Sequence, residues 1–416
     1  MRTMKPLHWA GVDYSLLQIL LAALLLCSRP FAVADKNDAL HRPRRNSSPT
    51  KRAGSIPLLI TNRCGETLWP GIETQEGTAP EEGGFELAAG KSKNLTVGGD
   101  WQGRIWGRTN CSFNADGTAS SKGDNTAACD SGDCGGVLNC VVTGSTPVTL
   151  AEFDLSGGVN KNQTFYDISL VDGYNLPLSI IYLPGDNPKL QDIPPNLTNP
   201  ACIATAGHLA DPAPSGWNGG ASNSSYPIPY EDSMSSTDVA KWCPWPLQVK
   251  QPTKPGAGIY PYPDDHIERP IFDPCLSGCA KTNSPEDCCT GKYKDPNKCK
   301  PNLFAKAAKA VCPDAYSYAF DDQTSTFIIP NGGGWEIRFC PEGRSTNILK
   351  TFSTQLHELN AAGGATKSIQ EACRNRTLIR EAGRSGAGRT RDGLRGMSGN
   401  LVALLMVVSW IGFIFY

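Results

Sequence analysis

Histidine is scarce in this chain: 5 occur among 416 residues, and only His208 and His266 lie between residues 55 and 345. Neither accompanies a nucleophile motif, which argues against Ser-His-Asp and Cys-His catalysis. Two histidines are also few for a metal site. Gly332–Gly334 precede a strand-like segment and not a helix, so this glycine run predicts a turn and not a phosphate loop. The sequence therefore predicts no metal and no cofactor.

An apolar run near the N-terminus defines the first segment. It spans Leu16–Leu26, follows Arg2 and Lys5, and precedes the small-residue triplet Ala32–Ala34. A basic start, a short apolar core and an A-x-A site are typical of a secretory signal. The run is about half of the ~20 residues that a spanning helix needs, which disfavours a retained membrane anchor. Residues 1–34 are therefore predicted to be a signal peptide.

A second apolar run, Leu401–Tyr416, ends the sequence, with no charged residue after it. Small residues at Ser385–Ala387, a polar spacer and an apolar tail are typical of GPI attachment. A single spanning helix is the rival, but three arginines between residues 389 and 395 would then lie outside, against the usual charge bias. We expect residues 346–400 to be a disordered Gly/Ala/Arg-rich tail and residues 401–416 to be a GPI-attachment signal.

The charge divides the chain into unlike parts. Residues 55–345 contain 33 acidic and 21 basic side chains, a net charge of −12, whereas the flanks carry +11. So acidic a region is a poor candidate for binding nucleic-acid phosphates, and suits cationic or neutral partners such as carbohydrate. Residues 35–54 form a basic segment without apolar periodicity, which predicts a disordered linker. Within it, Lys51-Arg52 is either a dibasic processing site or part of an uncut linker, and both interpretations stay open.

Residues 55–345 read as mainly β. The whole chain contains 43 glycines and 32 prolines, against 8% aromatic residues, which indicates many turns and short strands. Strand-like alternation predicts six strands, at Ser55–Asn62, Arg104–Thr109, Val148–Leu155, Tyr166–Val171, Leu178–Leu183 and Trp335–Phe339. One helix is predicted over Asn302–Cys312, with Leu303, Ala307 and Val311 on one face and Pro313 as its stop. Residues 207–274 predict long irregular loops.

Sixteen cysteines occur, of which Cys27 lies in the signal and Cys373 in the tail. The other fourteen lie between Cys64 and Cys340, and an even number in an exported chain predicts a disulfide framework. Each bridge would contribute about 2–4 kcal/mol by restricting the unfolded chain. These bridges would offset the poor core of the loop-rich segment.

Eight ordered segments resemble those of thaumatin-like proteins. They are Ile60–Cys64 with Trp69, Gly103–Cys111, Cys129–Cys140, Thr149–Phe153, Tyr166–Pro177, Cys288-Cys289, Cys312–Tyr318 and Arg338–Pro341. The resemblance covers nearly all of residues 55–345, although Ser131 stands where the family usually has threonine. It implies a flattened β-sandwich, with a disulfide-rich, loop-rich second domain around residues 178–312 that contains one helix.

The resemblance also implies the pairing of the cysteines. The family normally has eight bridges, and this chain lacks the pair that would fall just before Cys202 and at about Ile329. Seven bridges are expected: Cys64–Cys340, Cys111–Cys129, Cys134–Cys140, Cys202–Cys312, Cys243–Cys275, Cys279–Cys288 and Cys289–Cys299. Cys373 is left over.

Thaumatin-like proteins have an acidic cleft made of one Arg, one Glu and three Asp. The matching residues here are Arg104, with Arg108 as its alternate, and Glu152, Asp167, Asp172 and Asp321. Such a cleft accepts sugar hydroxyls in charge-assisted hydrogen bonds. With suitably spaced carboxyls it hydrolyses glycosides, Glu152 then being the acid and Asp167 or Asp172 its partner. A third interpretation is purely structural ion pairing.

The sequence therefore predicts a secreted or cell-surface monomer that binds β-1,3-glucan or another wall polysaccharide, with endo-β-1,3-glucanase activity as a further hypothesis. The rival is a protein-binding module, such as a hydrolase inhibitor, or an antimicrobial defence-type protein. A GPI tail would favour action on the producer's own wall, because a tethered protein does not diffuse. N-glycosylation is predicted at five acceptor sites in the domain, namely Asn94, Asn110, Asn162, Asn196 and Asn223.

Overall fold

The computed structural model describes residues 54–374, apart from 121–126, 159, 186, 205–242, 245–246, 250–273 and 342–344. All of them belong to one of two units of the chain, Arg52–Tyr416. The predicted signal peptide, the GPI-attachment tail and most of the loops expected at residues 207–274 lie outside the described residues, as do Asn223 and Lys51-Arg52.

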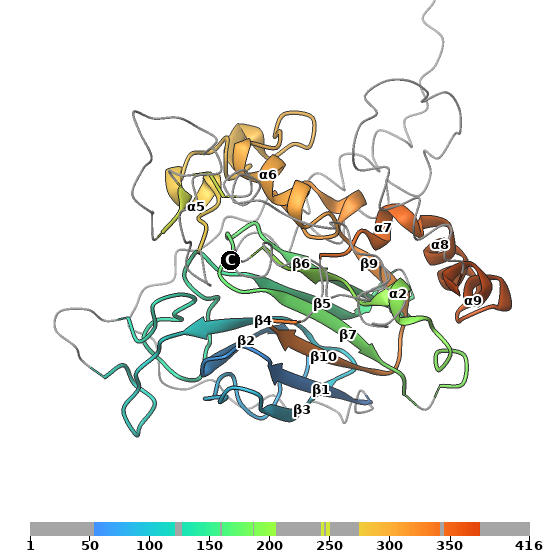
Figure 1. Cartoon of the computed structure of the whole chain (residues 1–416), viewed down its shortest axis with the longest axis horizontal. Helices are drawn as coiled ribbons and strands as arrows, with labels where there is room; N and C mark the ends of the chain where they lie inside the picture. Colours follow the sequence, from blue (N-terminus) through green and yellow to red (C-terminus); the bar gives the residue numbers. More distant parts are fainter. Residues whose placement is uncertain are drawn as a thin grey trace, which may run out of the picture. The chain divides into compact units, whose positions relative to one another are not determined.

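Two five-stranded sheets form the β-sandwich (Figure 1). The first has the order β3 (Ser92–Gly98), β1 (Ser55–Asn62), β10 (Gly334–Phe339), β7 (Leu178–Leu183) and β8 (Ala201–Cys202). The second has the order β2 (Leu68–Glu76), β4 (Gln102–Thr109), β5 (Leu150–Gly157), β6 (Gln163–Ser169) and β9 (Phe327–Pro330). Only β1 and β10 pair in parallel; the other named pairs are antiparallel.

Alternation along the strands sends apolar side chains to the core and polar ones to the other face. On β5, Ala151, Phe153 and Leu155 are buried in the main apolar cluster. That cluster also contains Ile60 of β1 and Ile105 of β4, both 0% exposed. Because the apolar parity of β5 is fixed in this way, Glu152 and Asp154 must face away from the main core.

The six predicted strands match β1, β4, β5, β6, β7 and β10, with ends shifted by up to three residues. Four further strands were missed. Strand β2 contains Pro70 and Gly71, which demote a strand in sequence reasoning but are tolerated at a sheet edge, where β2 lies. Strand β3 buries only Leu95 and Val97, and β8 and β9 are 2 and 4 residues long, too short for a period to show.

A small disulfide lobe, residues 276–312, contains α5 (Gly278–Thr282), the 3₁₀ turn η2 (Gly291–Tyr293) and α6 (Leu303–Val311). The predicted helix is α6, and Asn302 caps it by accepting a hydrogen bond from Ala305 N (2.9 Å). Its predicted face was right at Val311, which is buried, and wrong at Leu303, which is 59% exposed, because Phe304 and Ala308 are buried instead. The second domain also has more than the one expected helix, because α5 and the short α2 (Pro195–Thr198) precede α6.

Seven disulfides join the fourteen domain cysteines, and their pairing is the one that the family resemblance implies. Three of them hold distant segments: Cys64–Cys340 spans 276 residues, Cys202–Cys312 spans 110, and Cys243–Cys275 spans 32. Cys373 is a free, buried thiol. Burial raises its pKa to about 12.

The expectation of disorder after residue 345 is wrong for residues 346–374. They form α7 (Ile348–Thr351), α8 (Ser353–Ala362) and α9 (Lys367–Arg374), and α8 packs against β9. The buried side chains recur with a helical period, and six of them belong to the main core: Ile348, Phe352, Leu356, Leu359, Ile369 and Cys373. The Gly/Ala-rich stretch between α8 and α9 masked this period, because it reads as low complexity.

The predicted glycosylation sites differ in their exposure. Asn94, Asn110 and Asn162 are exposed. Asn196 is only 7% exposed, and its amide nitrogen donates a hydrogen bond to the carbonyl oxygen of Cys373 at 2.8 Å. A glycan on that nitrogen would break this contact, so the prediction at Asn196 does not fit the folded chain.

Candidate functional site

Four charged residues stand opposite one another on four neighbouring strands. Glu73 of β2 faces Arg104 of β4, Arg104 faces Glu152 of β5, and Glu152 faces Asp167 of β6. Residues that are directly opposite in adjacent strands project to the same face of the sheet. We call Glu73, Arg104, Glu152 and Asp167 the carboxylate row. It carries three carboxyl groups and one guanidinium.

Arg104 lies between two carboxylates of this row. Its Nη2 is 3.3 Å from Glu152 Oε1, and its Nε is 3.6 Å from Glu73 Oε2. Thr143 completes the contact, because its hydroxyl accepts from Arg104 Nη1 (3.0 Å) and donates to Glu73 Oε2 (2.6 Å). Burial alone would lower the pKa of Arg104, but the negative charges of Glu152 and Glu73 outweigh the effect of burial. The pKa of Arg104 is therefore raised, and its guanidinium stays protonated.

Asp167 is the innermost member of the row. It is 0% exposed, and neither carboxyl oxygen has a hydrogen-bond partner in the structure. Burial, reinforced by the charge of Glu152, raises the pKa of Asp167 well above its ordinary value. This position favours the protonated form of Asp167, because an ionised carboxylate without a hydrogen-bond partner costs much free energy when it is fully buried. A polysaccharide bound at the protein surface would therefore not touch Asp167.

Glu152 and Asp172 are both more accessible than Asp167. Glu152 is 9% exposed, and Asp172 is half-buried in the turn before Gly173. Burial raises the pKa of both groups, and the charge of Arg104 opposes that rise in both. Asp172 also raises the pKa of Glu152. Two coupled carboxyls, one held near a cation, are the arrangement in which one group keeps a proton while its neighbour is ionised.

Arg108, the alternate for the cleft, serves a different purpose. It is 0% exposed, and its guanidinium donates to four carbonyl oxygens at 2.7–3.2 Å, those of Trp69, Pro70, Val137 and Leu138. Burial lowers its pKa to about 10, only partly offset by Asp133. Arg108 therefore fastens the 134–140 disulfide loop to β2, and Arg104 is the arginine of the row.

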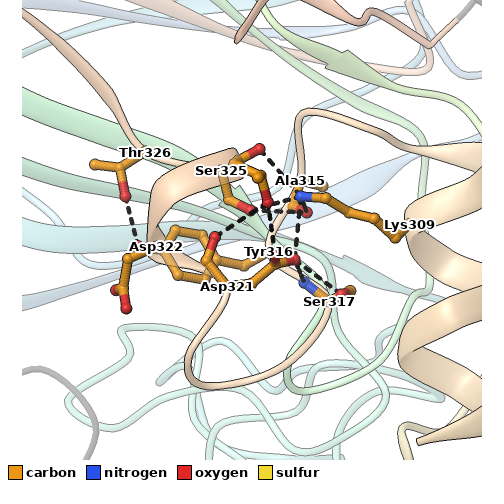
Figure 2. Close-up of polar contacts among 9 residues, drawn as sticks. Lys309, Ala315, Tyr316, Ser317, Asp321, Asp322, Ser325 and Thr326 are labelled. Carbon is orange, nitrogen blue, oxygen red and sulfur yellow. Dashed lines mark hydrogen bonds and ion pairs between the residues drawn. The ribbon is translucent and has the colours of Figure 1, made fainter. Parts of the chain in front are cut away.

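Asp321 is engaged elsewhere (Figure 2). Its Oδ2 accepts from Ser317 N and Ser317 Oγ and lies 3.1 Å from Lys309 Nζ, while Oδ1 accepts from Thr324. The charge from this segment that raises the pKa of Asp167 is that of the next residue, Asp322. Of the five predicted cleft residues, Arg104, Glu152, Asp167 and Asp172 are electrostatically linked, and Asp321 belongs to a neighbouring network around Lys309.

Sequence reasoning missed two participants, Glu73 and Thr143. Glu73 lies on β2, whose proline concealed the strand, and Thr143 lies in a loop. The signal available for Glu73 was its parity with Trp69 and Gly71, which becomes informative only after β2 is known to pair with β4. Within the described ranges, no group of three or more His, Cys, Asp or Glu side chains is arranged to hold a metal ion.

Two facing sheets, a lobe closed by disulfides and an Arg-centred row of carboxyls define a disulfide-rich β-sandwich protein with an acidic site. The chain matches the Thaumatin family over residues 62–341, and it belongs to that family.

Relatives align along nearly their whole length. The chain is 38% identical to pathogenesis-related thaumatin-like protein 3.5 of Cryptomeria japonica, over 70% of this chain and 92% of the relative. It is 35% identical to pathogenesis-related protein 5 of Arabidopsis thaliana, over 68% and 90%. Among solved structures, the thaumatin-like xylanase inhibitor TLXI aligns at 34% identity over 30% of this chain and 74% of its own, with a TM-score of 0.24.

Proposed function

We propose that this protein is an exported thaumatin-like protein that binds β-1,3-glucan through Asp172 and the three less buried members of the carboxylate row, Glu73, Arg104 and Glu152. The observation that carries the proposal is the position of Arg104 between Glu73 and Glu152, at 3.6 and 3.3 Å. This arrangement places a guanidinium donor beside carboxylate acceptors, and sugar hydroxyls use both kinds of partner. Charge-assisted hydrogen bonds of this type are stronger than those between neutral groups.

Hydrolysis is the second candidate, and the raised pKa of Glu152 favours it. A glycosidase needs one carboxyl that keeps its proton and one that is ionised. Glu152 suits the acid and Asp172 its partner, because Asp172 is the more exposed of the two. Asp167, the other partner considered, is fully buried and acts on a substrate only through Glu152.

The decisive experiment is a pull-down on insoluble β-1,3-glucan, with release of reducing sugar measured in the same tube. Glu152→Gln removes the charge and the proton while keeping the shape. If the row binds glucan, affinity falls by about ten- to a hundredfold, the equivalent of a charged hydrogen bond. If Glu152 is also a general acid, sugar release falls by about 10²–10⁴-fold.

Asp154→Asn is the matched control. Asp154 lies two residues along β5, is half-buried, and its pKa is also raised by burial, but its partners are Ser156, Glu76 and Lys161 and not Arg104. We expect glucan binding by this variant to match the unmodified protein. Unchanged binding by Glu152→Gln would reject the glucan proposal and favour the rival class, a protein-binding module or antimicrobial protein.

We further propose that the protein is held at the cell surface by a GPI anchor added after removal of residues 401–416. Among the residues that the structure describes, no helix is both long enough and apolar enough to cross a membrane. Phosphatidylinositol-specific phospholipase should release the protein from cells. Detection of the peptide Leu401–Tyr416 in the mature protein would contradict the anchor.

A further inference from the structure

Charge is unevenly distributed over the domain. The disulfide lobe, residues 276–312, holds seven lysines and three acidic residues, a net charge of +4, whereas the rest of residues 55–345 carries −16. A third of the basic residues of the domain thus lie in 37 residues. The separation is too strong to read as an ordinary mixed surface, in which both signs are interspersed.

Six of the lobe's lysines are exposed and form what we call the lysine patch: Lys281, Lys292, Lys294, Lys298, Lys300 and Lys306. The seventh, Lys309, turns inward to Asp321. The patch lies on a small scaffold, because Cys279–Cys288 and Cys289–Cys299 close loops of 9 and 10 residues. Helices α5 and α6, which carry Lys281 and Lys306, lie next to each other (Figure 1).

The acidic residues of the lobe are engaged within it. Asp287 accepts hydrogen bonds from Asn302 Nδ2 (2.9 Å) and Thr282 Oγ1 (2.7 Å), and Glu286 accepts from Tyr293. Asp295 accepts from Asn297 N and pairs with Lys298 at 3.4 Å, an exposed pair of low strength. These carboxylates hold the loops together, and with seven lysines against three acidic residues the lobe keeps its net positive charge.

We propose that the lysine patch binds an anionic polysaccharide that carries carboxylates along its length, of the polyuronate class. A thin, extended polymer touches the lobe alone, and charges farther away than the screening length of about 8 Å repel it little. A broad anionic surface would approach the acidic remainder as well. The lobe also offers little to insert into a bilayer, since Leu303 is its only exposed large apolar side chain among the described residues.

This site is separate from the carboxylate row, and the inference does not rest on glucan binding. Lysine suits such a ligand because its ammonium is a point charge that does not demand one fixed geometry. Binding should therefore depend on charge density along the polymer and on salt, and little on sequence of sugars. The protein would then have two carbohydrate-binding surfaces of opposite charge.

The test uses the full domain and three polymers or surfaces: polygalacturonate, neutral β-1,3-glucan, and vesicles of phosphatidylcholine with phosphatidylserine. The variant replaces Lys292, Lys298, Lys300 and Lys306 by Gln. Its control replaces four exposed lysines outside the lobe, Lys91, Lys161, Lys350 and Lys367, by Gln, which gives the same change in net charge. A second control replaces the four lobe lysines by Arg and keeps their charge.

We expect polygalacturonate binding that weakens as salt is raised. The lobe Gln variant should bind at least about tenfold more weakly, while the outside Gln variant and the Arg variant change less than about threefold. The melting temperature and glucan binding of the lobe variant should be unchanged. Equal losses in the two Gln variants, no binding of polygalacturonate, or preferential binding of the vesicles would each overturn the proposal.

Discussion

Glu73 and Glu152 share one guanidinium, although their strands are not neighbours in the sheet. Arg104, on the strand between them, lies 3.6 Å from one carboxylate and 3.3 Å from the other. The ionisation of Glu152 therefore depends on the charge of Glu73. This coupling makes Glu73 a positioning residue for the site, and it can be tested without a ligand.

Glu73→Gln should lower the pKa of Glu152. The change removes a like charge that raises this pKa and leaves Arg104 to pair with Glu152 alone. Titration of the glutamate side-chain carboxyl by carbon-13 NMR, with Glu152 assigned from Glu152→Gln, measures the shift. Glu76→Gln on the same strand is the control, because Glu76 acts on Asp154 and not on Glu152. An unaltered titration of Glu152 in Glu73→Gln would refute the shared role of Arg104.

Asp167→Asn should flatten the pH dependence of stability. The pKa of Asp167 in the folded protein is raised above its unfolded value of about 4. Below about pH 4 the side chain is protonated in both states, so it does not oppose folding. As pH rises towards the folded pKa, the unfolded chain loses the proton first and stability falls, by at most about 1.4 kcal/mol per pH unit. Urea unfolding at a series of pH values should show this decline in the unmodified protein and a smaller one in the variant. Identical slopes would mean that Asp167 is ionised in the fold.

Arg108→Met should destabilise the protein without altering the carboxylate row. The substitution removes the guanidinium donor from four buried or part-buried carbonyl oxygens, of which that of Pro70 keeps another donor, Phe85 N. We expect a loss of about 3 kcal/mol in the free energy of unfolding. The pKa of Glu152 should not move. Arg63→Met changes an exposed arginine and serves as the reference. If Arg108→Met shifted the titration of Glu152 while keeping stability, the assignment of Arg104 to the row would be wrong.

Leu359→Ala should lower the free energy of unfolding by about 2–5 kcal/mol, because this side chain of α8 is 0% exposed within the main core. His357→Ala, on the exposed side of the same helix, should change it by less than about 0.5 kcal/mol. Denaturant unfolding of both variants compares them directly. A disordered tail predicts no effect from either substitution, so equal stabilities would argue against docking of α8.

The C-terminal helices also explain how the chain tolerates its missing disulfide. The family bridge that is absent would join β8 to β9. Here Thr346 N donates to Ala201 O of β8 at 3.0 Å, and Asn360 Nδ2 donates to Ile328 O of β9 at 2.6 Å. One continuous segment thus contacts both strands. Hydrogen bonds and apolar packing of this extension take the place of the covalent link.

The sequence predicts those elements whose side chains show a clear pattern, and it does not predict contacts that depend on which strands pair. The predicted bounds of β1 and β7 match the structure to the residue, because both are short runs rich in β-branched and other apolar side chains between turn residues. The family resemblance supplied Glu152, Asp167 and Asp172. Glu73 could not be found in this way, because its role comes from the register of β2 against β4. Asp321, which the resemblance gave as a cleft residue, contacts Ser317 across a turn and Lys309 of a helix, and strand parity describes neither contact.

The strands that carry the row differ in how they are paired. Asp167, Glu152 and Arg104 lie on β6, β5 and β4, each paired on both sides, whereas Glu73 lies on β2 at the edge of the sheet. On its outer side β2 pairs, among the described residues, only with the irregular segment 83–87, through hydrogen bonds such as Leu68 N to Leu87 O (3.0 Å) and Ile72 N to Gly83 O (2.8 Å). Local opening requires less free energy where fewer buried contacts are lost. Opening of β2 alone would release Glu73 from Arg104 and leave Glu152 as its sole partner in the row. The charge balance around Arg104 would thus change when a single strand opens locally. Hydrogen exchange of the β2 amides would report how often Arg104 loses Glu73 as a partner.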